Sequence, residues 1–139
     1  QTAYSNGGTI SQVLAATLQN DTTYTLRVDV GKRLDAFPLN YSVALYAGLT
    51  LLDLESALDP SAGNFATSIV SYTSTLADPL AGQALRIELS SLFPQANFDN
   101  VRLDASGPSE AVPEPGTLAL LGAGLLAGGR SWRRRRSEA

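Results

Sequence analysis

Residues 22–30 read TTYTLRVDV, and in this stretch apolar and polar side chains alternate one by one. The apolar positions share one side of the predicted strand: Tyr24, Leu26, Val28 and Val30. A period of two residues is typical of a β-strand that has one face buried and the other in water. We therefore predict a half-buried strand, whose apolar face must pack against another element.

Five further stretches carry strand signals and are separated by turn residues: 7–18, 40–56, 64–75, 83–93 and 96–105. The stretch 40–56 is interrupted at Ala47-Gly48 and then resumes, which predicts a hairpin of two strands. The stretch 7–18 is the weakest, and a short helix over residues 11–20 is the alternative there. Six or seven short one-sided strands that must bury their apolar faces predict an all-β fold, an antiparallel β-sandwich of two facing sheets.

The charge is distributed unevenly along the chain, although the net charge is only −3. Residues 112–139 carry five Arg and two Glu, whereas residues 1–111 carry five basic and eleven acidic side chains, a net charge of −6. Neutralising phosphates requires a basic face, which such an acidic body lacks. We therefore expect no nucleic-acid partner.

The chain contains no cysteine and no histidine. This excludes disulfides, thiolate metal ligands and a cysteine nucleophile, and it removes the commonest general base. Two carboxylates can suffice for glycoside hydrolysis, but the sequence spacing places no two of them across a cleft. We therefore expect a non-enzymatic body with no catalytic residue and no cofactor other than a structural calcium.

Calcium is the ion that the residue types favour, because a hard cation is bound by carboxylate and carbonyl oxygens alone. The candidate ligands lie near strand ends or in loops: Asp29, Asp35, Asp99 and Asn100. No EF-hand spacing is present. The alternative is that Asp99 and Asn100 occupy the outward side or a bulge of the last strand.

Tyrosines raise the question of sugar binding, because sugars stack on exposed aromatic rings. Most of the tyrosines fall at core-facing positions of the predicted strands. Tyr46 is different, because it is out of phase with Tyr41, Val43 and Leu45 and stands beside the predicted turn. We therefore expect Tyr46 to face solvent, and it is our candidate for ligand contact.

The C-terminal segment 112–139 reads VPEPGTLALLGAGLLAGGRSWRRRRSEA. The two prolines disfavour helix before them, which predicts an extended strip at Pro113, Glu114 and Pro115. A short apolar helix follows, and its predicted membrane-span residues are Leu118, Leu120, Leu121, Leu125 and Leu126. Residues 117–132 would form a helix about 24 Å long, which is marginal for a hydrocarbon core of about 30 Å.

Arginines end the segment and are expected to stay cytoplasmic, because positive charge beside a span sets its orientation. They are Arg130, Arg133, Arg134, Arg135 and Arg136. The predicted domain organisation is thus a β-sandwich over residues 1–111, lacking some N-terminal residues and its export signal, and a sorting tail over residues 112–139.

This tail resembles the PEP-CTERM sorting signal of Gram-negative bacteria, in which a Pro-Glu-Pro motif, an apolar stretch and an arginine cluster follow in this order. The resemblance implies export, transient retention in the inner membrane, and recognition and cleavage by an exosortase. The body resembles the jelly-roll domains that often precede this signal, through TTYTLRVDVGKR, YSVALYAG and NFDNVRLDA. Such proteins are associated with exopolysaccharide and biofilm.

Two functional hypotheses follow. The first is a non-enzymatic exported protein of the cell surface or extracellular matrix. The alternative is a carbohydrate-binding module that contacts exopolysaccharide, with or without calcium. A shared sandwich architecture does not by itself imply a shared ligand.

Overall fold

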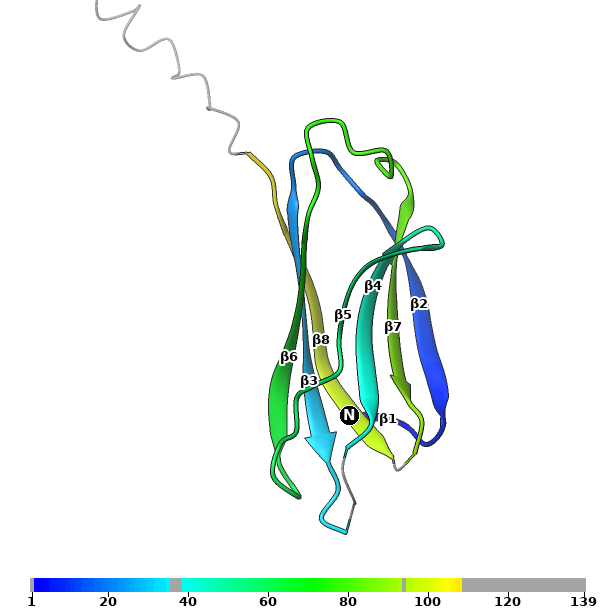
Figure 1. The fold of residues 1–139 in the computed structure, drawn as a ribbon, viewed down its shortest axis with the longest axis vertical. Coiled ribbons are helices and arrows are strands. Elements are labelled where there is room, and N and C mark those ends of the chain that lie inside the picture. Colours follow the sequence, from blue (N-terminus) through cyan, green and yellow to red (C-terminus); the bar gives the residue numbers. More distant parts are fainter. Residues whose placement is uncertain (1, 36–38, 94, 109–139) are drawn as a thin grey trace, which may run out of the picture. The chain divides into compact units, whose positions relative to one another are not determined.

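The computed structural model describes residues 2–35, 39–93 and 95–108, and these residues form eight β-strands and no helix (Figure 1). The strands are β1 (Ala3–Ser5), β2 (Gly8–Thr17), β3 (Thr23–Lys32), β4 (Tyr41–Ala47), β5 (Thr50–Glu55), β6 (Phe65–Thr73), β7 (Ala84–Ser91) and β8 (Ala96–Ser106). The all-β prediction is confirmed for this part of the chain.

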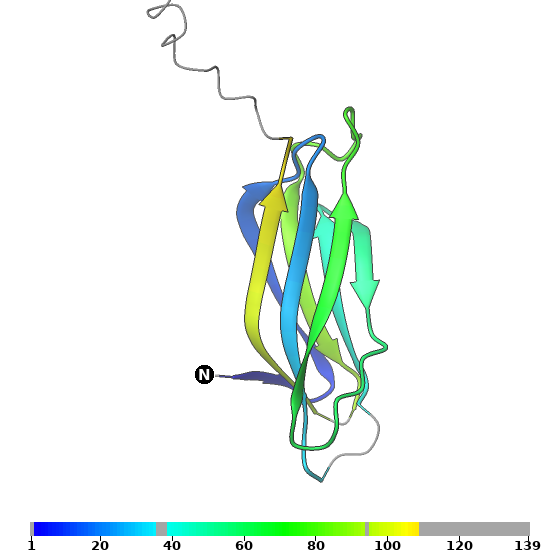
Figure 2. The ribbon, with the colours of Figure 1, turned by 90° about the vertical axis from the view of Figure 1, so that its left-hand side faces the viewer.

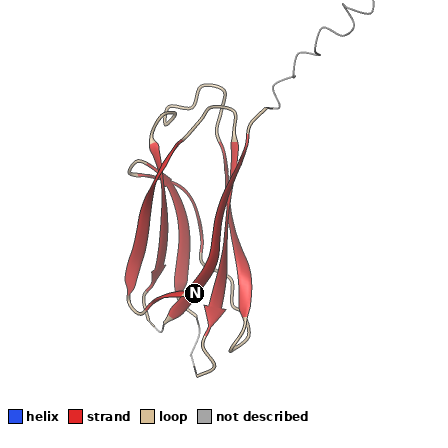
Figure 3. Cartoon of the chain, turned by 180° about the vertical axis from the view of Figure 1, so that it is seen from behind, coloured by secondary structure: helices blue, strands red, loops and turns tan. Residues whose placement is uncertain are grey.

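The strands form two antiparallel sheets of four, in the orders β1-β8-β3-β6 and β2-β7-β4-β5. Figure 3 shows the two sheets facing each other, and Figure 2 looks onto the outer side of the sheet that contains β8, β3 and β6. Each early strand lies beside a late one: β1 pairs with β8, β2 with β7, β3 with β6 and β4 with β5. This rolled-up pairing is that of an eight-stranded jelly roll.

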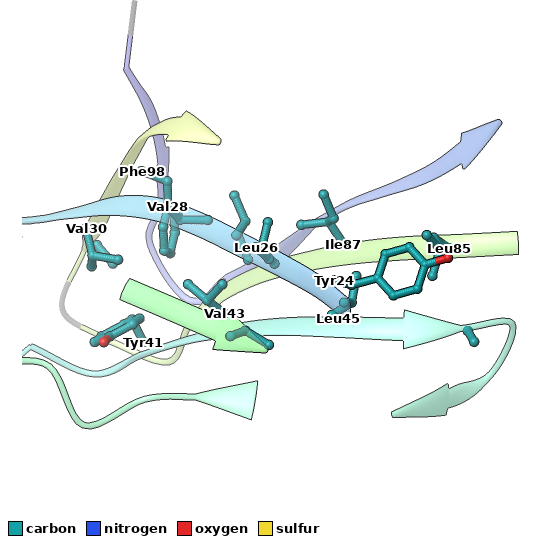
Figure 4. Close-up of a cluster of buried hydrophobic side chains, with 14 of the residues drawn as sticks. Tyr24, Leu26, Val28, Val30, Tyr41, Val43, Leu45, Leu85, Ile87 and Phe98 are labelled. Atoms are coloured by element: carbon teal, nitrogen blue, oxygen red, sulfur yellow. The ribbon is translucent and has the colours of Figure 1, made fainter. Parts of the chain in front are cut away.

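The core lies between the sheets and is built by the alternation that the sequence predicts (Figure 4). All four apolar residues of β3 are almost fully buried, with exposed fractions of 0–2%. The facing sheet contributes inward residues from β4 and β7: Tyr41, Val43, Leu45, Leu85, Ile87 and Leu89. Phe98 on β8 is 1% exposed and closes the core near β1.

The turn at Gly48 joins β4 to β5 and confirms the predicted hairpin. Gly48 has φ of 57°, a conformation that disfavours side chains, and a Cβ there would lie 2.7 Å from the Gln83 side-chain oxygen. Its N–H also donates to the Ala84 carbonyl at 2.8 Å. The hairpin is thereby tied to the start of β7.

The strand predicted over residues 7–18 is confirmed as β2, which pairs with β7, so the alternative helix over residues 11–20 is wrong. One strand was missed. The short strand β1 was not predicted at all, since three residues carry no periodic signal.

A polar network joins the two sheets at the end of β5. Glu55 accepts hydrogen bonds from the Tyr41 hydroxyl, from the Ser68 hydroxyl at 2.8 Å and from the backbone N–H groups of Ala57 and Leu58 at 2.6 and 3.1 Å. Tyr41 and Glu55 belong to one sheet and Ser68 to the other. Burial acts to raise the pKa of Glu55, but these hydrogen bonds outweigh it and hold that pKa below its usual value.

Phe98→Ala should lower the free energy of unfolding by about 3–5 kcal/mol, because it leaves a cavity in the packed core. The matched control is Val101→Ala on the same strand, where the side chain is 44% exposed and the loss should stay below about 1 kcal/mol. Denaturant unfolding of both variants measures the difference. The milder Phe98→Leu covers the case in which the alanine variant does not fold, and equal costs for Phe98→Leu and Val101→Ala would contradict the core position of Phe98.

The Glu55 network predicts a loss of stability in acid. Because its folded pKa is lowered, Glu55 stabilises the fold above its unfolded pKa, and this contribution disappears as the pH falls through the folded pKa. Urea unfolding of the wild type and of Glu55→Gln between pH 7 and pH 3 should therefore give a shallower acid-side decline for the variant. Parallel pH profiles for the wild type and Glu55→Gln would contradict this assignment.

Tyr41→Phe removes one hydrogen bond to the charged Glu55. It should lower the free energy of unfolding by about 1.5–3 kcal/mol at pH 7, measured by urea unfolding.

Candidate functional site

Three side chains meet on the outer face of the β2-β7-β4-β5 sheet: Tyr46, Arg86 and Glu88, hereafter the Tyr46 cluster. Tyr46 on β4 stands opposite Arg86 on β7, and the guanidinium carbon lies 4.0 Å from the centre of the tyrosine ring. Arg86 also forms an ion pair with Glu88, two residues further along the same strand. The side chains of Arg86 and Glu88 are only 20% and 24% exposed, which is low for charged groups on a sheet surface.

The cluster contains a proton donor held in its protonated form. Partial burial raises the pKa of the Tyr46 phenol, and the Glu88 carboxylate close to it raises this pKa further. The nearby Arg86 acts in the opposite direction but does not reverse the shift. At neutral pH the phenol therefore keeps its proton, and the charge of the neighbouring Glu88 carboxylate is balanced by Arg86.

Apolar side chains flank the cluster on the same face. Val13 on β2 stands opposite Arg86, and Leu51 on β5 stands opposite Tyr46. Val13 and Leu51 are 63% and 48% exposed, and Leu54, on the same strand as Leu51, is 44% exposed. A small polar centre with apolar surroundings suits a compact, mostly apolar molecule that carries one or two polar atoms.

Of the three members of the Tyr46 cluster, only Tyr46 is predictable from the sequence. Tyr46 lies on the face opposite to Val43 and Leu45, as its phase predicts, and it is partly exposed. Ligand contact by Tyr46 stays a prediction. Arg86 and Glu88 were not predicted as site residues, because nothing in the sequence gives the register that sets β7 beside β4.

Three of the four calcium candidates lie together on the outer face of the other sheet. Asp29 on β3 stands opposite Asp99 on β8, and Asn100 follows in a bulge with φ of 52°. Asp29 accepts hydrogen bonds from Thr67 at 2.7 Å and from the Asn100 amide at 2.9 Å, and these lower its pKa. Both Asp29 oxygens thus have protein donors, and the bulge weighed as the alternative for the last strand is present.

The fourth candidate, Asp35, lies apart from the other three. Both of its carboxylate oxygens accept hydrogen bonds from Arg33, each at 2.9 Å, and this interaction lowers the pKa of Asp35. Within residues 2–35, 39–93 and 95–108, no group of three or more His, Cys, Asp or Glu side chains is arranged to hold a metal ion.

The tail predictions fall outside the described residues. They comprise the Pro113-Glu114-Pro115 motif, the leucine-rich span and the arginine block. Among the residues that the structure does describe, no helix has the length and apolar character needed to cross a bilayer.

Two solved cyclases from Fischerella sp. TAU resemble this chain. One is the Stig cyclase Fisc in complex with (3Z)-3-(1-methyl-2-pyrrolidinylidene)-3H-indole, with 37% identity and a TM-score of 0.63 over 70% of this chain. The other is a cyclase in complex with 4-(1H-indol-3-yl)butan-2-one, with 35% identity and a TM-score of 0.66 over 76% of this chain. The matches span 55% and 64% of the lengths of these two cyclases.

Family models assign both parts of the sequence. Residues 111–136 match the PEP-CTERM protein-sorting motif, which confirms the resemblance of the tail and supports export with an exosortase as processing partner. Residues 1–104 match the HpiC1-like family, described as HpiC1 cyclase. A search of curated proteins finds no match.

These matches overturn the expectation of a non-enzymatic body, because the similar proteins are enzymes. The expectation gave too much weight to the absence of histidine. Carboxylates and phenols also transfer protons, and the fold sets a tyrosine beside a carboxylate on neighbouring strands. The chain belongs to the HpiC1-like cyclase family.

Proposed function

We propose that this protein is an exported cyclase that acts on a small, largely apolar aromatic substrate at the Tyr46 cluster. The observation that carries the proposal is the half-buried Tyr46–Glu88–Arg86 arrangement on an open sheet face, in a chain of cyclase family. Support for an aromatic substrate comes from the two similar cyclases, both of which hold indole compounds.

Ring closure within one molecule requires no oxidant or reductant. It requires a general acid that protonates the substrate atom where electron density builds up. It also requires a general base that removes a proton from the substrate atom that loses electron density. In this proposal the Tyr46 phenol gives the first proton and the Glu88 carboxylate takes the second. Passage of a proton from Glu88 back to Tyr46 then restores both groups, so the reaction is an isomerisation.

Arg86 has two tasks in this scheme. Its ion pair holds the Glu88 side chain in place, and its stacking on the Tyr46 ring holds the tyrosine side chain. The exposed leucines of β5 provide contact area for the apolar part of the substrate.

Polysaccharide contact is the less favoured function for the same face. A sugar ring stacks on a free aromatic face, and Arg86 already covers one face of the Tyr46 ring at 4.0 Å. An indole depends less on stacking against the Tyr46 ring, because it can also contact the exposed apolar side chains of Val13 and Leu51.

The tail is proposed to act as a temporary membrane anchor. Its leucines would hold the chain in the inner membrane with the arginines in the cytoplasm, while an exosortase cuts near Pro113-Glu114-Pro115. The product would be a cyclase released to the cell surface or extracellular matrix.

Substitution of the cluster tests the site. The full chain should bind 4-(1H-indol-3-yl)butan-2-one in ligand-observed NMR, and Tyr46→Ala should weaken the affinity by about tenfold through loss of ring contact. Glu88→Gln should bind with similar affinity but lose the ability to cyclise an indole-bearing substrate. The matched control is Tyr4→Ala, which removes a 64% exposed tyrosine from the other sheet.

Equal loss of affinity in Tyr46→Ala and Tyr4→Ala would place the ligand elsewhere. Retained turnover in Glu88→Gln would remove Glu88 from the mechanism while leaving the binding face intact.

Processing of the tail has its own test. Intact-mass spectrometry of the protein recovered outside the native cell should show a chain that lacks Arg133 to Arg136, and the same mass locates the cut. Replacing the motif by alanines at Pro113, Glu114 and Pro115 should leave the uncut chain in the membrane fraction. An extracellular protein that still carries the arginines would contradict cleavage.

A further inference from the structure

We propose that the outer face of the β1-β8-β3-β6 sheet binds an uncharged polysaccharide, with the Phe65 ring as the surface on which a sugar ring stacks. Phe65 is the first residue of the edge strand β6, and it is 49% exposed. The Tyr46 cluster belongs to the other sheet, so this proposal does not depend on the proposed cyclase function. Figure 2 shows β8, β3 and β6 side by side, and among the described residues no other strand lies over their outer side.

The Phe65 ring lies over a glycine of the neighbouring strand. Gly31 on β3 pairs with Phe65, and a Cβ at Gly31 would come within 2.6 Å of two ring carbons, Cε1 and Cζ. Gly31 follows the core residue Val30 and so stands on the outward side of β3, yet it is buried. The ring therefore fills the space of the missing side chain, with one face toward the sheet and the other toward water.

A fixed amide stands beside the ring. Asn97 on β8 pairs with Gly31 from the side opposite to Phe65. The Asn97 side-chain oxygen accepts a hydrogen bond from the Gln95 amide at 2.8 Å, and the Gln95 oxygen accepts one from Arg33 at 3.2 Å. These bonds orient the Asn97 amide, whose own N–H groups make no hydrogen bond to the described residues. They can donate to the hydroxyls of a sugar.

The next row across the sheet supplies a fixed acceptor. Thr67, Asp29 and Asp99 stand side by side there on β6, β3 and β8. Asp29 is held by hydrogen bonds from Thr67 at 2.7 Å and from Asn100 at 2.9 Å. Each carboxylate oxygen has two lone pairs, so Asp29 can accept a further bond from a hydroxyl. Neighbouring strands lie about 5 Å apart and successive rows about 7 Å, which places ring, amide and carboxylate within the span of one or two sugar units.

The chemistry of this face selects an uncharged glycan as the ligand. A sugar ring packs its C–H groups on an aromatic face, while the hydroxyls at its rim bind amides and carboxylates. A purely apolar ligand would leave Asn97 and Asp29 without partners. An acidic polymer would be repelled by Asp29, by Asp99 and by the net charge of −6 on residues 1–111.

A polymer fits this face better than a single sugar. Contacts with several units of one chain add up, which offsets the shallow contact with each unit. The sorting motif supports export, so the face would meet polysaccharides outside the cell.

Affinity electrophoresis tests the site. The full chain is run in native gels that contain dextran, galactomannan, a soluble β-glucan or, as the acidic polymer, alginate. At least one of the three uncharged polymers should retard the wild type. Phe65→Ala should raise the dissociation constant, measured at several polymer concentrations, by about tenfold or more, because the stacking surface is lost. The matched control is Ile69→Ala, on the same strand and face and 53% exposed, which should bind as the wild type does.

Further variants separate stacking from a structural role of the ring. Phe65→Leu keeps an apolar side chain over Gly31 but has no flat face, so it should fold and bind weakly. Gly31→Ala keeps the ring, but the new methyl group displaces it from the sheet, and this should weaken binding as well. Phe65→Tyr keeps the ring face and should bind as the wild type does. Urea unfolding verifies that each variant keeps the fold.

Three results would overturn the proposal. The first is a wild type that none of the three uncharged polymers retards. The second is a Phe65→Leu variant that binds as tightly as the wild type, because the aromatic face then plays no part. The third is retardation by alginate that disappears in Phe65→Ala, because the ligand of this face is then acidic; retardation by alginate through the arginine-rich tail would be equal in both chains.

The Tyr46 cluster provides the control for position. Tyr46→Ala should bind the polysaccharide as the wild type does, and Phe65→Ala should keep the affinity for 4-(1H-indol-3-yl)butan-2-one. Loss of polysaccharide binding in Tyr46→Ala but not in Phe65→Ala would place the glycan on the other sheet and would also overturn the proposal.

Discussion

The structure depends on the burial of one face of β3 between the two sheets. β3 is central in its sheet, with β8 on one side and β6 on the other, and its four alternating apolar residues are almost fully excluded from water. Each such side chain contributes about 1.5–3 kcal/mol relative to exposure, and both neighbouring strands take their register from β3. A shift of β3 by one residue would turn this whole apolar set toward solvent.

The sequence predicts most of the fold because the burial of one face of each strand leaves a simple two-residue period of apolar side chains. Alternation identified β3 and its buried face and indicated strands at β4 and β7, and Gly48 marked the hairpin between β4 and β5. The strand β1 was not predicted, because three residues are too few to show an alternation. The order of the strands in each sheet could not be predicted either, because pairs such as β1 and β8 join segments that are far apart in the chain.

The candidate site was less predictable than the fold, because it also depends on pairing between strands that are distant in the sequence. Tyr46 could be selected because it breaks the alternation of its own strand, which is local information. Its neighbours Arg86 and Glu88 lie about 40 residues away in the sequence, and they meet Tyr46 only through the register of β4 with β7. The absence of histidine suggests a protein without catalysis only if other acid–base groups are left out, and a tyrosine near a carboxylate is such a pair.

The position of β8 has a consequence for export. This strand supplies the partner of β3 along most of its length, yet it is the last strand of the body and is followed directly by the sorting motif at residues 111–136. A jelly roll is dominated by contacts between distant segments, and such folds form slowly. The sandwich therefore cannot close until β8 is available to pair with β3. The strand order thus brings completion of the fold close in time to synthesis of the sorting motif.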